Sequence, residues 1–389
     1  MNKKAENKKQ KMNDPERKNK PIFSKPRAFE NTKVIFDGLN GFLSIAISKN
    51  DKMIAIGDWD TGDGKVRTFS MNEEIDNDGN DNNNKWNLKF EKEEKMSSYP
   101  IRLLVFSDDG KYLLSCSHDE PVILSDAKTL KKIKTFDGHT GSVYSVLFKS
   151  ENEIVSCSWY HEIIVWDINS GNQIATVDTG NNCGFLALNP NKEMIVVGQI
   201  DGNIIAYEST IVNNTLKKIT DLPKIHTNWI NSLCFTPNGK MLISFSDDTT
   251  INVYEVLSNK SFNHLRTLTG HTNAIYGGAI SPDGEIIASG SVDNTIKLWN
   301  INTGNCVKII KSHTSAVGQL AFSHSGSFLA SVSDDCTIRI TTNESVARFR
   351  NEKVHVMLSL AKSAVFIPFD ICQDYLVFVN AMQLKHCIY

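Results

Sequence analysis

Serine, histidine and aspartate recur in this 389-residue chain in sets that look like hydrolase triads. His271 precedes Asp293 by 22 residues. Two further pairs repeat that spacing, His226 with Asp248 and His313 with Asp335. A catalytic centre needs one such constellation, whereas repetition at a constant spacing suits an architectural element. We therefore predict that these sets are structural and that the chain is not an enzyme.

Other signatures of chemistry are missing from the sequence. It contains no Gly-x-x-x-x-Gly-Lys-Ser/Thr phosphate loop, no His-Glu-x-x-His and no Gly-x-Ser-x-Gly. The eight cysteines include no Cys-x-x-Cys pair and mostly lie in apolar runs, so we interpret them as core residues. Asp247-Asp248 and Asp334-Asp335 are acidic pairs, but the second member of each belongs to the repeated pattern. We predict no metal and no cofactor.

Charge is distributed unevenly along the chain. Residues 1–30 hold ten Lys or Arg against four Asp or Glu, a net of +6, so the remainder carries −8 of the total of −2. We predict a disordered basic tail over 1–30 and do not expect the chain as a whole to bind nucleic acid. The N-terminus lacks a secretory signal and no window is apolar enough to span a membrane, so a cytoplasmic location is expected, with a nuclear one possible.

Between about residues 32 and 342 the chain repeats one pattern of short apolar runs and turns. Segments 230–255, 274–300 and 317–341 each contain three runs rich in Ile, Val, Leu and Phe, separated by turns rich in Asp, Asn, Gly, Ser or Pro. Such runs are typical of strands buried on both faces. The sequence therefore predicts an all-β fold built from repeated units.

One turn position measures the period of the repeat. It is occupied by aspartate in most units and by Tyr160 in one. The occupants are Asp119, Tyr160, Asp201, Asp248, Asp293 and Asp335, spaced by 41, 41, 47, 45 and 42 residues. A divergent first unit is anchored at Asp63, and an acidic, Asn-rich insertion explains its longer gap of 56 residues. Seven units of this length have the period of four-stranded propeller blades.

Several units also carry Gly-His and Trp-Asp marks. These are Gly138-His139, Gly270-His271 and Trp166-Asp167, with partial matches at Ile225-His226, Ser312-His313 and Trp299-Asn300. On these residues the chain resembles the WD-repeat family, over about 310 of its 389 residues. The resemblance implies a seven-bladed β-propeller of four-stranded antiparallel blades, which we place at residues 31–343.

The resemblance also implies a buried network in which histidine bridges the turn aspartate and a strand serine, which in turn reaches tryptophan. We place that serine two residues before the turn position, as in Ser291. Equivalent serines are Ser117, Ser158, Ser246 and Ser333. A complete network is then expected only for His271, Ser291, Asp293 and Trp299. Partial networks are expected for His139 with Trp166, His226 with Asp248, and His313 with Asp335, and the unit containing Tyr160 should be weaker.

The ring must close, because an open ring leaves strand edges exposed. Thr32–Phe36 could supply the last strand of the final blade, or Val346–Arg350 could do so locally. We expect the first arrangement. Residues 71–95 are interpreted as an acidic Asn-rich insertion, flexible over 71–84, with its adjoining strand, and residues 344–389 as an irregular segment or a partial extra blade.

The remaining candidate site is the surface that carries the histidine loops. Residues just before the turn position, and residues second in each inner strand, are expected to form its centre. The partner-binding candidates are Arg102, Tyr144, Trp159, Asn231, Asp247, Tyr276 and Asp334. Arg, Tyr and Trp are enriched in binding hot spots, although exposed aromatic residues are also ordinary surface, and Trp159 could simply fill the space of the missing aspartate. We predict a scaffold for partner proteins or peptides within a multiprotein complex. The alternative is a nucleic-acid-associated factor that uses the basic tail.

Overall fold

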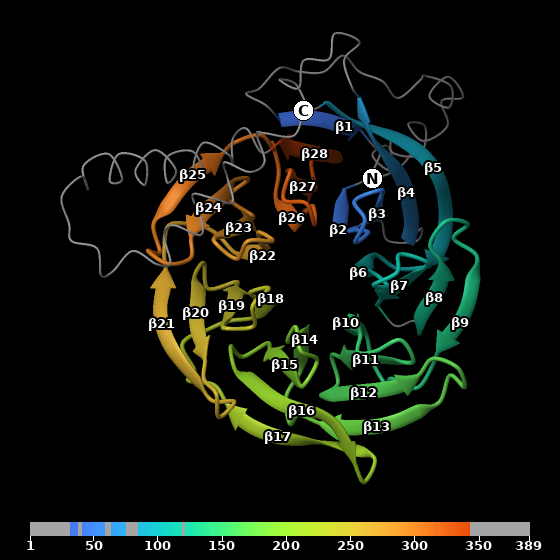
Figure 1. The fold of residues 1–389 in the computed structure, drawn as a ribbon, viewed down its shortest axis with the longest axis vertical. Coiled ribbons are helices and arrows are strands. Elements are labelled where there is room, and N and C mark those ends of the chain that lie inside the picture. Colours follow the sequence, from blue (N-terminus) through green and yellow to red (C-terminus); the bar gives the residue numbers. More distant parts are fainter. Residues whose placement is uncertain (1–31, 38–40, 59–63, 75–84, 119–120, 343–389) are drawn as a thin grey trace, which may run out of the picture. The chain divides into compact units, whose positions relative to one another are not determined.

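A computed structural model of the chain describes residues 32–37, 41–58, 64–74, 85–118 and 121–342. These residues form seven four-stranded antiparallel sheets arranged as the blades of a ring (Figure 1). No helix in the described part of the chain is long and apolar enough to cross a membrane. The predicted fold class, a seven-bladed β-propeller, is confirmed.

Each blade except the last takes four consecutive strands, numbered from the inner strand outward. Blade 1 contains β2 (Phe42–Ile47), β3 (Met53–Asp58), β4 (Gly64–Glu74) and β5 (Lys85–Ser97). Blade 2 contains β6 (Ile101–Phe106), β7 (Tyr112–Ser117), β8 (Val122–Asp126) and β9 (Lys132–Phe136). Blade 3 contains β10 (Val143–Phe148), β11 (Glu153–Ser158), β12 (Glu162–Asp167) and β13 (Gln173–Asp178). Blade 4 contains β14 (Cys183–Leu188), β15 (Met194–Gln199), β16 (Ile204–Val212) and β17 (Thr215–Asp221).

The remaining three blades follow the same order. Blade 5 contains β18 (Ile230–Phe235), β19 (Met241–Ser246), β20 (Ile251–Val256) and β21 (Phe262–Leu268). Blade 6 contains β22 (Ile275–Ile280), β23 (Ile286–Ser291), β24 (Ile296–Asn300) and β25 (Cys306–Ile310). Blade 7 contains β26 (Val317–Phe322), β27 (Phe328–Ser333), β28 (Thr337–Thr342) and, from the other end of the chain, β1 (Thr32–Asp37).

The ring closes through the N-terminal strand. β1 pairs antiparallel with β28, in a register that joins Thr32 to Thr341 and Asp37 to Thr337. Closure by Thr32–Phe36 is therefore confirmed, while the alternative strand Val346–Arg350 lies outside the described residues. A second contact joins blades 7 and 1, because the Asp51 carboxylate accepts the backbone N–H groups of His324 at 2.7 Å and Ser325 at 2.8 Å.

The core lies between neighbouring blades rather than inside one sheet. One cluster combines Val155 and Ile163 of blade 3 with Ile195 and Val197 of blade 4, and the other clusters join successive pairs of blades in the same way. The second strands are buried along almost their whole length, as in β23, whereas outer strands such as β13 alternate between buried and exposed residues. Apolar runs in the sequence thus correspond to the inner layers of the ring.

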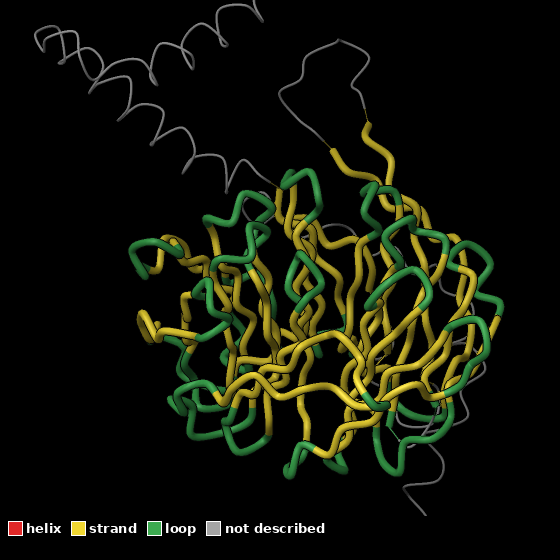
Figure 2. The backbone as a smooth tube through the Cα atoms, turned by 60° about the horizontal axis from the view of Figure 1, so that its bottom comes forward, coloured by secondary structure: helices red, strands yellow, loops and turns green. Residues whose placement is uncertain are grey.

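The strands occupy the middle of the ring, and the turns gather at its two ends (Figure 2). The insertion in blade 1 begins later than the sequence suggested. Met71–Glu74 belong to β4 and pair with Leu88–Lys85 of β5, so this stretch extends a hairpin and is not loop. The rest of the acidic stretch, 75–84, lies outside the described residues, as do Asp63, Asp119, the basic tail and the segment 344–389.

Candidate functional site

The buried histidine network is complete in blade 6. The His271 ring places Nδ1 2.8 Å from Asp293 Oδ2 and Nε2 2.7 Å from Ser289 Oγ. Trp299 Nε1–H donates to the same serine oxygen at 2.9 Å. An ionised carboxylate can only accept, so His271 donates from Nδ1 and its Nε2 accepts the serine proton. Four side chains from one loop, two strands and a turn are thus joined inside the blade.

The serine of this network is Ser289, so the sequence-based assignment of Ser291 was wrong. Trp299 pairs across the strands with Ile287, which makes Ser289 its diagonal neighbour on the same face of the sheet. Ser291 lies two residues further along β23, at its end. There its hydroxyl donates to the Asn273 carbonyl at 3.0 Å and accepts the Asp293 N–H at 3.1 Å. Ser291 therefore shapes the loop and the turn, while Ser289 joins the imidazole to the indole.

Blades 5 and 7 repeat the histidine, serine and aspartate contacts without an indole. His226 Nδ1 lies 2.8 Å from Asp248 Oδ2 and its Nε2 lies 2.7 Å from Ser244 Oγ. Blade 7 repeats this with distances of 2.9 and 2.8 Å, from His313 to Asp335 and Ser331 respectively. Tyr254 and Thr341 occupy the tryptophan position in these blades.

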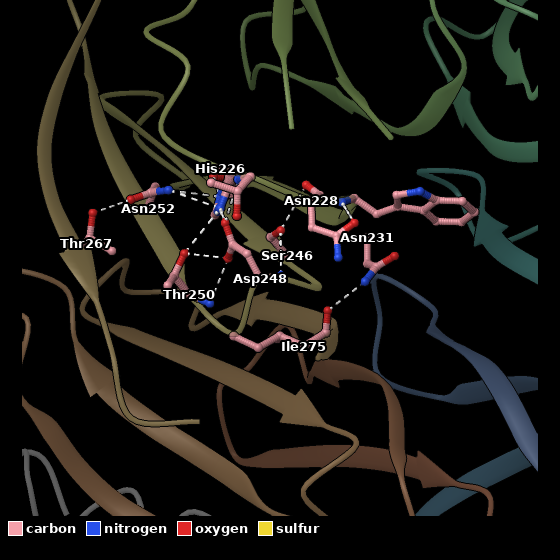
Figure 3. Close-up of polar contacts among 12 residues, drawn as sticks. His226, Asn228, Asn231, Ser246, Asp248, Thr250, Asn252, Thr267 and Ile275 are labelled. Atoms are coloured by element: carbon pink, nitrogen blue, oxygen red, sulfur yellow. Dashed lines mark hydrogen bonds and ion pairs between the residues drawn. The ribbon is translucent and has the colours of Figure 1, made fainter. Parts of the chain in front are cut away.

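Blade 5 adds an amide to its network. Asn252 Nδ2 lies 3.1 Å from His226 Nε2, and its Oδ1 accepts the Thr267 hydroxyl at 2.5 Å. Figure 3 shows Asn252 between Thr267 and the imidazole, with Asp248 also contacting the ring. The network therefore extends from the loop to the outer strand β21. The repeat pattern of the sequence could not predict this extension, because it compares equivalent positions and not contacts between strands.

Blade 3 keeps the network although Tyr160 replaces its turn aspartate. Glu162, two residues further on, places Oε2 3.3 Å from His139 Nδ1. Ser156 Oγ lies 2.6 Å from His139 Nε2 and accepts the Trp166 indole N–H at 2.8 Å. The expectation that only blade 6 has a complete network was therefore wrong, because the longer glutamate side chain reaches the position of the aspartate from the next strand. That this blade is weaker stays a prediction.

The electrostatics of blade 6 match a neutral histidine beside an ionised aspartate. Burial opposes ionisation of Asp293, but hydrogen bonds from Thr295 and His271 outweigh it and lower the pKa to about 2. Burial also lowers the pKa of His271, against the opposing effect of Asp293. The same lowering by burial acts on the pKa of His313. These groups hold constant charge near neutral pH, as a structural clamp requires.

The centre of the histidine-loop face is positioned by a β-bulge repeated in every blade. Each inner strand loses register with its neighbour after its first residue, so the second residue is left out of the ladder. A bulge re-aims the side chain that it carries. The bulge residues are Leu43, Arg102, Tyr144, Gly184, Asn231 and Tyr276, with Gly318 and Gln319 in blade 7.

One half of this face carries a chain of aromatic contacts, which we call the aromatic bridge and define as Tyr144, Trp159 and Trp229. The ring centroids of Tyr144 and Trp159 are 5.4 Å apart, and those of Trp159 and Trp229 are 4.9 Å apart. Trp229 precedes β18 of blade 5, so the bridge joins blades 3 and 5. Arg102 extends it to blade 2, with its guanidinium carbon 4.6 Å from the Tyr144 ring centroid.

Hydrogen bonds hold the base of the aromatic bridge. Arg102 Nε–H donates to His118 Nε2 at 2.9 Å, and His118 Nδ1 lies 3.1 Å from Ser142 Oγ. Sequence reasoning missed Trp229, because it occupies a loop position that the repeat does not single out. Its only signal was an indole one residue before a predicted inner strand.

The other half of the face is acidic. Asn231 Nδ2 donates to Asp247 Oδ1 at 2.5 Å and to the Ile275 carbonyl at 3.0 Å, a contact visible in Figure 3. Burial raises the pKa of Tyr276, and the charges of Asp247 and Asp334 raise it further. The phenol therefore lies in the field of both carboxylates. The structure thus divides the seven candidate residues into Arg102, Tyr144 and Trp159 on one side and Asn231, Asp247, Tyr276 and Asp334 on the other.

Burial and neighbouring charge act together on the two carboxylates. Burial raises the pKa of Asp247, and so does the charge of Asp248, while Asn231 opposes the shift. The pKa of Asp334 is raised by burial and by Asp335. Within the described ranges, no group of three or more His, Cys, Asp or Glu side chains could hold a metal ion.

Comparison with known proteins gives repeated matches to one family. The profile described as "WD domain, G-beta repeat" matches residues 130–167, 217–255, 262–300 and 304–341. Similar curated proteins include a ribosome biogenesis protein WDR12 homolog of Trichoplax adhaerens, 29% identical over 144 residues, or 36% of this chain and 32% of that protein. Ribosome biogenesis protein YTM1 of Scheffersomyces stipitis is 30% identical over 177 residues, or 44% and 37%.

A third relative has a different role in its name. The cell division cycle 20.1 protein of Arabidopsis thaliana, described as a cofactor of the APC complex, is 26% identical over 210 residues, or 51% of this chain and 44% of that protein. The chain therefore spans about a third to less than half of the length of these relatives.

Proposed function

Because this chain belongs to the WD-repeat family of β-propellers, we propose that it is a non-catalytic scaffold that binds partner proteins or peptides on its histidine-loop face. The family alone does not assign a function, so the proposal depends on the chemistry of that face. The repeated Ser/His/Asp sets are buried inside the blades, where they link loops to strands. That placement supports a structural role for them.

The aromatic bridge is the observation that carries the proposal. Tyr144 and Trp159 of blade 3 and Trp229 of blade 5 form a half-buried aromatic surface beside Arg102. Tyr, Trp and Arg dominate binding hot spots, because Tyr and Trp bury large areas with few rotatable bonds and all three keep polar groups for hydrogen bonds. The acidic half beside it adds charge that a partner can match.

The proposal is tested by quantitative capture of partners with variants of the face. Tyr276→Ala with Asp334→Asn removes one exposed ring and one carboxylate without touching the Arg102–His118 contact. We expect this double variant to lose specific partners at least about tenfold in abundance. The matched control is Ile309→Ala, which removes an exposed apolar side chain from the outer strand β25. Equal recovery of every partner by the double variant and the control would exclude the acidic half of this face.

Two of the relatives are named ribosome biogenesis proteins, and this favours extending the proposal to ribosome assembly. In that case the chain acts as a subunit of a large assembly. We expect it to co-sediment with ribosome precursors in a sucrose gradient and to shift to light fractions in the Tyr276→Ala with Asp334→Asn variant. Sedimentation of the wild-type chain only in light fractions would remove the extension and leave the scaffold proposal standing.

The second candidate, direct binding of nucleic acid by the basic tail, is a separate proposal. The net charge of +6 over residues 1–30 supports it, and the −8 of the remainder opposes it. Binding of RNA should then fall steeply with salt and disappear on deletion of residues 1–30. Unchanged binding by the deleted chain would refute it. The cytoplasmic location stays a prediction, and the ribosome biogenesis relatives favour testing a nuclear one by microscopy.

A further inference from the structure

The turn that follows the inner strand of blade 5 is held together by one side chain. It joins β18 to β19 and has the sequence Thr236-Pro237-Asn238-Gly239-Lys240. Because the histidine loops precede the inner strands, this turn lies at the opposite end of the ring. Asn238 Oδ1 accepts the Thr236 hydroxyl at 2.8 Å and the Lys240 backbone N–H at 3.0 Å. The amide oxygen of Asn238 thus serves as the shared acceptor of the turn.

Two other blades build the same turn on an aspartate. In blade 2, Asp109 Oδ1 accepts the Ser107 hydroxyl at 2.7 Å and the Lys111 N–H at 3.0 Å. In blade 6, Asp283 Oδ1 accepts a hydroxyl and an N–H from the equivalent positions. An amide oxygen and a carboxylate oxygen can accept the same hydrogen bonds. This turn therefore accommodates aspartate and asparagine alike.

Among the seven turns that follow the inner strands, all of which the structure describes, only blade 5 has asparagine before glycine. In blade 1 Asn50 precedes Asp51, and in blade 4 Asn191 precedes Lys192. The backbone is the same in each, since Gly239, Asp51 and Lys192 have φ of 69°, 55° and 60°. Glycine carries no side chain that would hinder the approach of its nitrogen to the preceding amide carbon. The three turns thus differ in the residue after the asparagine and not in backbone conformation.

The turn of blade 5 both promotes and restrains an attack of the Gly239 nitrogen on Asn238 Cγ. The two donors on Asn238 Oδ1 stabilise the negative charge that develops on this oxygen during the attack. The Asn238 side chain is exposed, so its amide group can leave into water. The restraint is the Gly239 N–H, which donates to the Thr236 carbonyl at 2.8 Å and must be released first. The attack is therefore slow in the folded chain, but it is not blocked.

We propose that Asn238-Gly239 is a site of spontaneous covalent modification, at which the amide of Asn238 is converted to a carboxylate. The Gly239 nitrogen forms a bond to Asn238 Cγ, and the amide group leaves as ammonia, taking up the proton of the Gly239 N–H. Water then opens the five-membered imide. Cleavage of the bond between Cγ and nitrogen gives aspartate, and cleavage at the backbone carbonyl gives isoaspartate. Solvent water is the sole co-reactant.

The aspartate product should resemble blade 2. Lys240 occupies the position of Lys111, whose Nζ lies 2.9 Å from Asp109 Oδ2. Hydrogen bonds from Lys111 and Ser107 lower the pKa of Asp109 to about 2. A carboxylate at position 238 is then ionised at neutral pH, so the modification adds a negative charge while the turn is kept. The isoaspartate product instead places an extra carbon atom in the main chain and disturbs the hairpin.

Mass spectrometry of the aged full-length chain tests the proposal with an internal control. The purified chain is incubated at neutral pH and physiological temperature and digested at low pH, where the imide does not form because the attacking nitrogen keeps its proton. The mass gain from replacing NH₂ by OH is followed on the peptides that contain Asn238 and Asn50. Asn50 is the matched control, since its Oδ1 accepts the Ser48 hydroxyl at 2.8 Å and the Lys52 N–H at 3.1 Å.

We expect Asn238 to convert at least about tenfold faster than Asn50 in the same sample. Equal rates at the two residues, or no conversion of Asn238 in the folded chain, would overturn the proposal. This comparison needs no variant, so it does not depend on how any substitution affects folding. It is also independent of the proposed scaffold function, which concerns the other end of the ring.

The variant Gly239→Asp tests whether glycine determines the rate. It copies the sequence of blade 1, where aspartate adopts the same positive φ, and a Cβ at position 239 would meet only Pro190, at 3.5 Å. Conversion of Asn238 should then fall to the rate of Asn50, and circular dichroism shows whether the variant is folded. An unchanged rate in the folded variant would contradict the role of glycine.

The variants Asn238→Asp and Asn238→Ala test whether the turn keeps its aspartate product. Asn238→Asp should leave the midpoint of urea denaturation unchanged, because Asp109 and Asp283 hold the same turn. Asn238→Ala should lower the midpoint, since two donors lose their acceptor. An equal loss in both variants would refute retention of the turn after modification.

Discussion

Blades 6 and 3 build the same histidine network from different residues. In blade 6 the carboxylate comes from Asp293 at the turn, 2.8 Å from the imidazole, and in blade 3 it comes from Glu162 in the next strand, 3.3 Å away. Asp293 also accepts the Thr295 hydroxyl at 2.6 Å and the Thr295 N–H at 3.0 Å. Glu162 has only the Thr140 N–H, at 3.3 Å, as a further donor in the described structure.

The difference shows that the network requires a carboxylate at one place in space rather than at one place in the repeat. A side chain longer by one methylene group offsets a displacement of two residues. It does so with fewer donors, and hydrogen bonds to a charged group are individually worth about 1.5–3 kcal/mol. Blade 6 should therefore draw more stability from its carboxylate than blade 3 does.

The largest expected effect tests what the two blades share. Trp299→Ala and Trp166→Ala each remove a fully buried indole together with the donor to the network serine. We expect each variant to lower the free energy of unfolding by about 3–5 kcal/mol, measured by urea denaturation followed by circular dichroism. Trp229→Ala, which removes a half-buried indole of the aromatic bridge, is the control and should cost clearly less. A small loss in only one of the buried variants would show that the blades do not share this anchor.

The next effect tests the register of the serine. Ser289→Ala leaves both His271 Nε2 and Trp299 Nε1 without their partner and should cost about 2–3 kcal/mol. Ser291→Ala removes only the contacts to the loop and the turn and should cost about 1 kcal/mol. The two variants form a matched pair on one strand. A larger loss of stability in Ser291→Ala than in Ser289→Ala, measured by urea denaturation, would show that Ser291 is the serine of the network.

Isosteric changes of the carboxylates measure the difference between the blades directly. Asp293→Asn should destabilise by about 1.5–3 kcal/mol, because it removes a charged acceptor shared by three residues. Glu162→Gln should cost below about 1 kcal/mol, since its two contacts are long. Equal losses in the two variants would contradict the idea that donor number decides the strength.

Lowering the pH should show the same difference in stability between the carboxylates of blades 6 and 3, with a smaller effect. The pKa of Asp293 is lowered to about 2 in the folded state, against about 3.9 in an unfolded chain. Its stabilisation is therefore fully present above pH 4 and is lost as the pH falls through 2. The lowered pKa of His271 acts in the same direction, since the unfolded chain takes up protons first below about pH 6.5.

Urea denaturation at a series of pH values measures this contrast. The wild-type chain should lose about 1–2 kcal/mol more than Asp293→Asn between pH 4 and pH 2. Glu162→Gln is the comparison for blade 3 and should follow the wild-type chain over this range, because it keeps Asp293. If the free energy of unfolding depended on pH in the same way in the wild-type chain and in Asp293→Asn, Asp293 would not be the titrating group.

The architecture could be predicted from the sequence because its signals are local. Apolar runs, turn residues and a constant period each concern neighbouring positions, and together they predict seven blades. They left two candidate strands for ring closure, and the resemblance to the WD-repeat family favoured Thr32–Phe36. The bulge residues were also predictable as a set, since one position per repeat carries them. What each bulge residue contacts was not predictable, because those contacts join different blades.

Three features of the sites illustrate that limit. Ser289 and Ser291 are both small, both in β23 and two residues apart, and only the pairing of Trp299 with Ile287 distinguishes them. Glu162 reaches His139 because its side chain is longer than that of aspartate. A count of sequence positions does not take side-chain length into account. Trp229 gains its role from aromatic residues of another blade, such as Trp159, 70 residues earlier in the chain.

The amino-acid sequence by itself determined that this chain repeats a three-strand pattern with the period of propeller blades, because that pattern follows from hydrophobic period and turn chemistry. The buried histidine network was implied by the resemblance to the WD-repeat family. Only the tertiary structure decided which side chains meet at the two mouths of the ring. The aromatic bridge joins blades 3 and 5, and the ion pairs of Asp108 join blades 1, 2 and 4. Such contacts depend on the angle at which separate blades are held, and ring closure sets that angle.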